Sequence, residues 1–560
     1  MDWSAFLYNP ILTLLRILGG LGIFLYGMQT MSGGIHQWAG NRLHGFVQGL
    51  TATPLSGILT GMGVTTLIQS SSATTVVLVS MVNAGLIPLR NSIAVIMGAN
   101  IGTTFTAWAV SLLGFSLDIS SFALPAIALS LPFRFSKREA NKRFAQILLG
   151  FGLLFLGINE MKLGLSVLDQ SDVISRVLLH FPETGLLSRL IFILLGAGLS
   201  LALQSSSAAI TLTLTMVYLG QLPFSLAAAI VLGENIGTTL TAYVASLEMS
   251  VEAKRCARSH MLFNIFGVLW MFFLVDPMIL LVDLCVPGAL LEPSAITFHL
   301  AAFHTFFNSI NTLLLAGFIP RIEKLVSWLV PEKETDLQKP GNIPWIRGNL
   351  PDAGDANLIN ARGAVIRLSR EVRIMADYVI NYFEPSLTDK TELASLIEEK
   401  EISIDGMEES ILAHLSECAL QHLTEEQAQW VAARMRIIGE FERIGDGLVT
   451  IHNLAEKLVK RKDGISSEKI NQLLEIAFSV RDFLEYISTL LDQDVADQEM
   501  KLARTMEEEI NQFRSKLDKT SRKRIKSGGN LKGELLFMEI VRRFEILGDD
   551  CIVIAKDLSR

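Results

Sequence analysis

The sequence predicts an all-α protein in two parts: a polytopic membrane domain with inverted repeats and two re-entrant hairpins, followed by a soluble helical domain of two three-helix bundles. Three observations predict this fold. Charged side chains are sparse in 1–330, with 30 in total, and dense in 331–560, with 74. Apolar stretches of the first part are long enough to cross a bilayer, and a segment of it recurs. We therefore place a membrane domain at 1–330, a linker at 331–356 and a helical domain at 357–560.

Charge and cysteine content narrow the function classes. The range 1–330 carries 16 Lys and Arg against 14 Asp and Glu, and the whole chain has a net charge of −8. This excludes a basic surface for nucleic acid, so no nucleic-acid partner is expected. The four scattered cysteines form no C-x-x-C pair or Cys/His cluster, so neither a disulfide framework nor a zinc site is expected.

Six apolar stretches have the length of a membrane-spanning helix. They lie near 11–33, 91–113, 145–165, 225–247, 259–284 and 296–318. Three further stretches are less simple. A polar run interrupts both 55–85 and 190–220, and 119–133 is short and contains two prolines.

Clusters of basic residues orient these stretches, because loops rich in Lys and Arg stay in the cytoplasm. The clusters are Arg134, Lys137, Arg138, Lys142 and Arg143, then Lys254, Arg255 and Arg258, and finally Arg321 and Lys324. The first two clusters should both lie in the cytoplasm. If 145–165, 190–220 and 225–247 all crossed the membrane, the second cluster would lie outside. We therefore expect 190–220 to be a re-entrant hairpin, and 55–85 likewise if 119–133 crosses. The C-terminal domain is then cytoplasmic, at the inner membrane.

An internal repeat relates the two interrupted stretches. Gly61–Trp108 aligns without a gap to Gly196–Tyr243, with 20 identities in 48 columns. A Gln-Ser-Ser-Ser run and an Asn-Ile-Gly-Thr-Thr run occur in both copies. The repeats cover about 11–133 and 145–285, and the orientation above makes them inverted, which is typical of alternating-access transporters.

The repeated polar runs are the candidate binding site. A half-helix that begins inside the membrane offers unpaired N–H groups and the positive end of its dipole to an anion, while amide, hydroxyl and carbonyl oxygens suit a monovalent cation. The alternative is that Ser and Thr only join packed helices, but duplication of both runs favours a site. The candidates are Gln69, Ser70, Ser71, Ser72, Asn100, Thr103, Thr104, Gln204, Ser205, Ser206, Ser207, Glu234, Asn235, Thr238 and Thr239.

Glu234 is the acidic member of this set and replaces Ala99 of the first repeat. An ionisable side chain at membrane depth is a functional candidate by default. We expect it either to supply charge to a cation site or to titrate during transport. The alternative is a carboxylate paired with donors at a helix end.

With its duplicated Gln-Ser-Ser-Ser hairpin, the chain resembles the type II sodium-phosphate cotransporter family over about 10–318. The resemblance implies that both runs contribute to phosphate and sodium sites, and that transport is coupled to the sodium gradient. It also implies a homodimer. Such a carrier runs outward when gradients allow, and bacterial relatives are linked to phosphate export as well as uptake.

The soluble part of the chain has helical periodicity in six segments. They lie at about 357–384, 388–420, 424–462, 465–493, 495–525 and 530–559. The run Phe441–Asp446 recurs in looser form as Phe544–Asp549, which places Glu442 with Asp446, and Glu545 with Asp549, on one helix face. Such carboxylate pairs either hold a cation or form a solvated acidic face.

These motifs resemble PhoU-like domains over about 357–558. The resemblance implies a metal, divalent or of iron type, at Glu442, Asp446, Glu545 and Asp549, and regulation of phosphate transport. The sequence shows no arrangement of a nucleophile with a base that would indicate an enzyme. The sequence leaves two other functions open: a carrier for another small anion such as a phosphonate or carboxylate, and a phosphate-binding membrane sensor without net flux.

Overall fold

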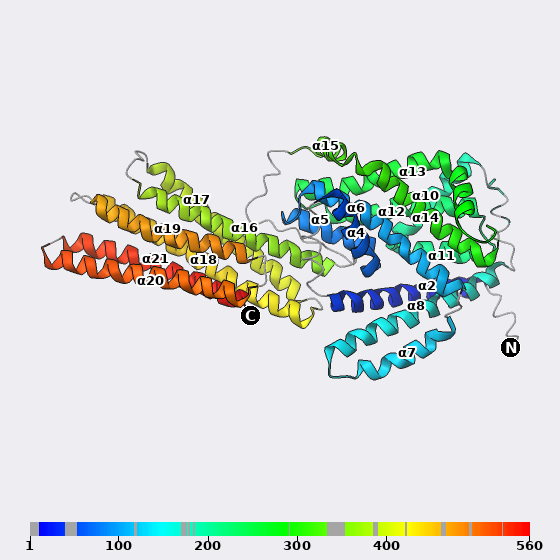
Figure 1. Cartoon of the computed structure of the whole chain (residues 1–560), viewed down its shortest axis with the longest axis horizontal. Coiled ribbons are helices and arrows are strands. Elements are labelled where there is room, and N and C mark those ends of the chain that lie inside the picture. Colours follow the sequence, from blue (N-terminus) through cyan, green and yellow to red (C-terminus); the bar gives the residue numbers. More distant parts are fainter. Residues whose placement is uncertain are drawn as a thin grey trace. The chain divides into compact units, whose positions relative to one another are not determined.

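The computed structural model describes residues 10–39, 53–116, 120–169, 176, 178, 180–182, 185–290, 292–332, 353–384, 390–420, 423–460, 466–491, 495–528 and 530–559. Within these ranges the regular structure is helical and includes no strand, which confirms the predicted fold class. The described residues form two compact units, the membrane unit up to residue 332 and the helical unit from residue 354 (Figure 1).

The described part of the membrane unit contains helices of very different length. They are α2 Pro10–Ala39, α4 Pro54–Ile68, α5 Ser71–Asn83, α6 Leu89–Ala109, the π-helix η1 Val110–Ser116, α7 Ser120–Arg134, α8 Glu139–Asp169, α10 Leu186–Leu203, α11 Ser206–Tyr218, α12 Phe224–Ala245, α13 Val251–Cys285, α14 Pro293–Ala316 and α15 Ile319–Leu329. Six are long and apolar enough to cross a membrane: α2, α6 with η1, α8, α10, α12 and α13.

Two differences from the predicted spans are found. The first half of 190–220 forms α10, which alone is long enough to cross, so the two interrupted stretches are not equal in length. The last predicted span, 296–318, qualifies only together with α15, which bends away from α14 by 85°. Helix α15 buries Ile319 and Val326 and exposes Arg321 and Trp328. This amphipathic pattern suits a helix that lies at a membrane surface.

Helices α2 and α8 pack through glycines, with α7 beside them (Figure 1). A Cβ atom added to Gly20 would lie 3.0 Å from the carbonyl oxygen of Gly157, and one added to Gly27 would lie 2.8 Å from that of Gly150. Residue numbers rise along α2 as their partners' numbers fall along α8, so the two helices run antiparallel. In the sequence the same glycines correspond to each other, Gly20 to Gly150 and Gly27 to Gly157.

The two repeats also pack alike. A Cβ atom on Gly98 of α6 would lie 1.9 Å from the carbonyl oxygen of Ile58 on α4. At the matching position, a Cβ on Gly233 of α12 would lie 1.9 Å from that of Ile193 on α10. Only glycine permits such close backbone approach, so each Asn-Ile-Gly-Thr-Thr helix is held against the first helix of its own interrupted stretch.

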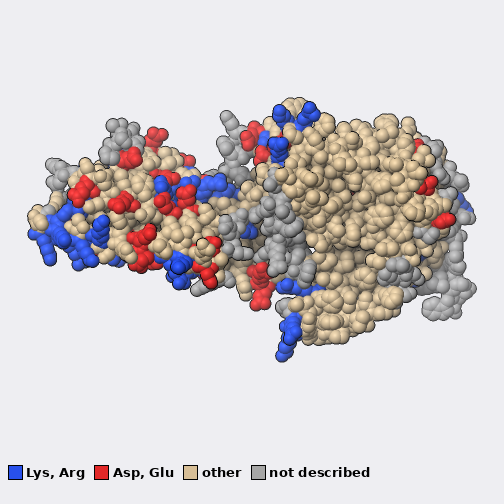
Figure 2. All heavy atoms as spheres, viewed as in Figure 1, with Lys and Arg blue, Asp and Glu red and all other residues tan. Residues whose placement is uncertain are grey.

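The helical unit consists of α16 Ala353–Tyr382, α17 Thr391–Ala419, α18 Glu425–Val459, α19 Ser467–Leu490, α20 Asp497–Lys526 and α21 Leu531–Leu558, close to the six predicted segments. Its buried side chains form one continuous core that draws on every one of these helices, so the two predicted bundles share a single interior. The two repeated motifs lie close together. Gly447 of α18 directly follows the first motif, and a Cβ atom added to it would lie 2.5 Å from Cδ2 of Leu547 in the second motif on α21. Figure 2 shows charged side chains spread over this unit, whereas the visible face of the membrane unit carries few.

Candidate functional site

Helix α4 ends at Gln69, where the chain turns into α5. Gln69 has the left-handed conformation, with φ 60° and ψ 21°, and Ser70 caps α5 by accepting a hydrogen bond from the N–H of Ala73 at 3.1 Å. The hydroxyl of Thr65 donates to that of Thr74 at 3.2 Å. In a continuous helix nine residues would span roughly 13 Å, so the chain folds back at Gln69.

The second repeat has the same break. Helix α10 ends at Gln204, with φ 50° and ψ 25°, and Ser205 caps α11 by accepting from the N–H of Ala208 at 3.2 Å. Among the described residues, Gln69 and Gln204 are the two non-glycine residues with positive φ. This conformation is costly for a residue with a Cβ atom, and its place at both predicted hairpin tips indicates a functional constraint.

The two breaks face one cavity of about 380 Å³. Its lining comprises both Gln-Ser-Ser-Ser runs, together with Leu203 and part of α2. Two segments that are far apart in the sequence thus meet at one place, as two hairpin tips are expected to do. Of the predicted site residues, Gln69 to Ser72 and Gln204 to Ser207 are brought together here.

The cavity offers hydrogen-bond donors without charge. The hydroxyls of Ser71, Ser72 and Ser206 have no protein partner among the described residues, and no charged side chain of that part of the chain lines the cavity. Backbone N–H groups in the first turn of α5 and α11 have no intrahelical acceptor. Two helix N-termini with free hydroxyls suit a small oxyanion.

Thr106 links the two tips, and it was not among the predicted site residues. Its hydroxyl donates to Oε1 of Gln69 at 3.0 Å and lies 3.4 Å from the hydroxyl of Ser207. Thr106 is one of the identical columns of the repeat, so the signal was present in the sequence. A second missed residue is Ser32 of α2, which lines the cavity and donates to the carbonyl of Ile68 at 2.6 Å.

The Asn-Ile-Gly-Thr-Thr runs do not line the cavity. Asn100, Thr103 and Thr104 donate to carbonyls of their own helix, at 2.9, 3.0 and 2.8 Å. Asn235, Thr238 and Thr239 do the same, at 2.8, 2.8 and 2.7 Å. These six bonds stay within α6 and α12, and the glycine contacts described above are what pack the two helices against α4 and α10.

Residues 23–163 and 172–281 match the model of a protein family described as Na+/Pi-cotransporter. The membrane unit is therefore similar to the Na+/Pi-cotransporter family over these residues. The matched residues contain both breaks and every described residue that lines the cavity, so the resemblance found through the Gln-Ser-Ser-Ser runs is confirmed for this unit, hereafter the cotransporter unit. This similarity supports phosphate transport across a membrane.

Three relatives illustrate the match. The chain is 23% identical over 468 residues to "Putative inorganic phosphate export protein YjbB" of Salmonella typhimurium, which covers 83% of this chain and 82% of that one. It is 27% identical over 312 residues to the uncharacterized protein YqeW of Bacillus subtilis, with coverage of 55% and 96%. It is 35% identical over 117 residues to sodium-dependent phosphate transport protein 2A of Oryctolagus cuniculus, with coverage of 20% and 18%. No solved structure matches.

Glu234, on α12, does not line the cavity between the two tips. The side chain is 2% exposed, and its Oε1 accepts a hydrogen bond from the hydroxyl of Thr213 on α11 at 2.9 Å. The neighbouring Asn235 contacts Nε2 of His304 on α14 at 3.3 Å. Glu234 therefore connects the Asn-Ile-Gly-Thr-Thr helix to the second half of its own hairpin.

In the helical unit, acidic side chains of α17 and α18 gather near the first repeated motif. Burial is the main cause that raises the pKa of Glu442, and repulsion from Asp446, Glu408 and Asp405 raises this pKa further. Burial and the charge of Asp446 likewise raise the pKa of Asp405. This mutual repulsion would be relieved by a bound cation.

The second motif is different. Arg514 of α20 lies 3.8 Å from Glu545, and the charges of Lys556 and Arg514 partly offset the effect of burial, which raises the pKa of Asp549. The guanidinium of Arg514 thus faces the second motif, whereas carboxylates face the first motif. In the described part of the chain, no group of three His, Cys, Asp or Glu residues is arranged to hold a metal ion.

Proposed function

We propose that the protein is a sodium-coupled carrier of inorganic phosphate in the inner membrane, with phosphate bound between the two hairpin tips. The observation that carries this proposal is the single cavity lined by both Gln-Ser-Ser-Ser runs. Free hydroxyls and helix N-termini supply donors for a phosphate oxyanion.

The neutral cavity also favours ion coupling. An anion moved from water into an uncharged site loses hydration, and this cost falls when a cation enters with it. Gln69 and Gln204 line the cavity, and an amide oxygen, which has a second lone pair beside one that accepts a hydrogen bond, is of the type that a hard monovalent cation prefers. Glu234 is the acidic candidate for the cation site, either supplying charge to the cation or titrating during transport.

Alternating access follows from the repeats. Helices α2 and α8 correspond in sequence and pack antiparallel through the same glycines, which supports an inverted relation between the halves of the unit. Inverted halves expose one midplane site to either side of the membrane in turn. The direction of net flux then follows the gradients, in keeping with one relative named for export and another for sodium-dependent transport.

The helical unit is proposed to lie in the cytoplasm and to regulate the carrier. The match to the Salmonella relative spans 468 residues, more than the cotransporter unit contains, so the relative shares part of this unit. A divalent cation between α17 and α18, at Glu442 and Asp446, is the proposed signal.

The proposal is tested by uptake of labelled phosphate into proteoliposomes with an imposed sodium gradient. The wild type should accumulate phosphate, and a Ser71→Ala, Ser206→Ala double variant should not. The matched control is Ser130→Ala with Ser166→Ala, two membrane-helix serines that bond to carbonyls of their own helices. Binding without gradient-driven flux would indicate the sensor, and uptake of a phosphonate or carboxylate in preference to phosphate would indicate a carrier for that anion.

A further inference from the structure

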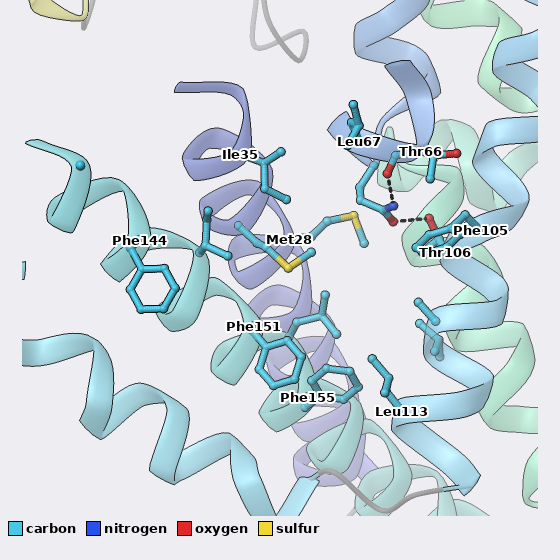
Figure 3. Close-up of a pocket in the computed structure, with 17 residues that line it drawn as sticks. Met28, Ile35, Thr66, Leu67, Phe105, Thr106, Leu113, Phe144, Phe151 and Phe155 are labelled. Atoms are coloured by element: carbon cyan, nitrogen blue, oxygen red, sulfur yellow. Dashed lines mark hydrogen bonds between the residues drawn. The ribbon is translucent and has the colours of Figure 1, made fainter. Parts of the chain in front are cut away.

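A second and larger cavity lies in the cotransporter unit, on the other side of Gln69. It has a volume of about 750 Å³ and lies between α2 and α8 on one side and α4, α6 and η1 on the other. Figure 3 shows Phe144, Phe151 and Phe155 of α8 opposite Phe105 and Leu113, with Met28 of α2 between them. Most of its lining residues belong to α2, α6 with η1, and α8, which have the length and apolarity of membrane spans.

The lining drawn from the described residues has no charged side chain, and its polar side chains are Thr66, Gln69 and Thr106. Both ends of the Gln69 amide are already paired, because Nε2 donates to the carbonyl of Thr66 at 2.5 Å and Oε1 accepts from Thr106 at 3.0 Å. The Gln69 amide on this wall therefore requires no polar ligand. The cavity suits an apolar occupant, and its chemistry differs from that of the cavity between the tips.

The apolar cavity is continuous with surface that faces the bilayer. Phe105 of α6 and Phe144 of α8 line it and are 50% and 47% exposed. Large apolar side chains exposed on membrane-spanning helices are in contact with lipid. The material next to the opening is therefore hydrocarbon.

The volume fits a lipid chain. An apolar protein cavity of about 150 Å³ takes up one benzene molecule, which has six carbon atoms. On that scale a cavity of 750 Å³ holds roughly 30 carbon atoms, enough for a complete acyl chain. An empty apolar space of this size would forfeit the dispersion contacts of its walls.

We propose that this cavity is a binding site for the acyl chain of a membrane phospholipid, with the chain inserted between α8 and η1 and its end against Gln69. The bound chain supports the hairpin tip from the side opposite the phosphate cavity. The proposal concerns the lipid alone and holds for any substrate of the carrier.

The test uses a phospholipid with a photoreactive group near the end of its acyl chain. Purified protein is reconstituted with this lipid, extracted in detergent, freed of unbound lipid and irradiated, and the labelled residues are mapped by mass spectrometry. Labels are expected at Met28, Leu113 and Phe151. Leu280, on an exposed face of α13, should be unlabelled because bulk lipid has been removed. Equal labelling of Leu280, or no label at the cavity, would overturn the proposal.

Variants complete the test. Ala109→Trp fills the cavity and should abolish its labelling. Ala128→Trp adds the same indole to an exposed position of α7 outside the cavity and should leave the labelling unchanged. Leu113→Trp serves the same purpose if Ala109→Trp does not purify as folded protein. Undiminished labelling in a folded filled variant would contradict the site.

Discussion

The bond between Thr106 and Gln69 gives the most informative single perturbation. Gln69 has a backbone conformation that costs about 1 to 2 kcal/mol for a residue with a side chain, and two side-chain hydrogen bonds hold it there. Thr106→Val keeps the shape of the side chain and removes the donor to Oε1. Leaving that acceptor unpaired costs about 1 to 2 kcal/mol. The hairpin tip then spends less time in the conformation that binds phosphate.

A shift of this size corresponds to roughly a five- to thirtyfold change in the equilibrium between tip conformations, and the apparent dissociation constant rises by up to the same factor as the competent fraction falls. Titration calorimetry with phosphate on purified protein measures it. The matched control is Thr215→Val, another buried threonine, whose hydroxyl bonds to the carbonyl of Thr211 within its own helix. Equal phosphate affinity in the two folded variants would refute the role assigned to Thr106.

Packing and charge give three more predictions. Gly98→Ala should greatly lower the melting temperature, because its Cβ would lie 1.9 Å from the Ile58 carbonyl oxygen, whereas Gly63→Ala, which has open space, should not. Glu234→Gln should weaken the sodium dependence of uptake at constant phosphate; unchanged dependence would remove Glu234 from the cation site. Burial raises the pKa of Asp550 from 3.8 to about 6, so the folded state binds this proton more tightly, and stability should fall as pH rises through that window. Hydrogen exchange in α21 should show this fall, and Asp550→Asn should flatten it.

Much of the fold could be predicted because hydropathy and periodicity are local signals. The apolar stretches locate the long helices to within eight residues at either end, and the six helical segments after residue 353 have nearly the observed bounds. The bend between α14 and α15 was missed, although Gly317 ends α14 and Pro320 lies in the first turn of α15. The shared core of the helical unit was missed because periodicity shows that a helix face is buried but not which helix covers it.

The candidate site was predicted in part. Duplication marked both Gln-Ser-Ser-Ser runs, and the structure brings them to one cavity. Duplication also marked Asn100 and Asn235, which the structure places on the packed helices behind it. A repeat shows that residues are constrained and does not separate binding from packing. Ser32 was missed because α2 joins the cavity only through tertiary contact.

The central claim is that two hairpin tips form one phosphate site. Equilibrium binding of labelled phosphate to purified protein, with Ser71→Ala and Ser206→Ala measured singly and together, tests it most directly. The account predicts one phosphate per chain in the wild type, weaker binding of that same phosphate in each single variant, and coupling between the two changes. Two phosphates per chain, with each variant removing one and leaving the other unaffected, would contradict it.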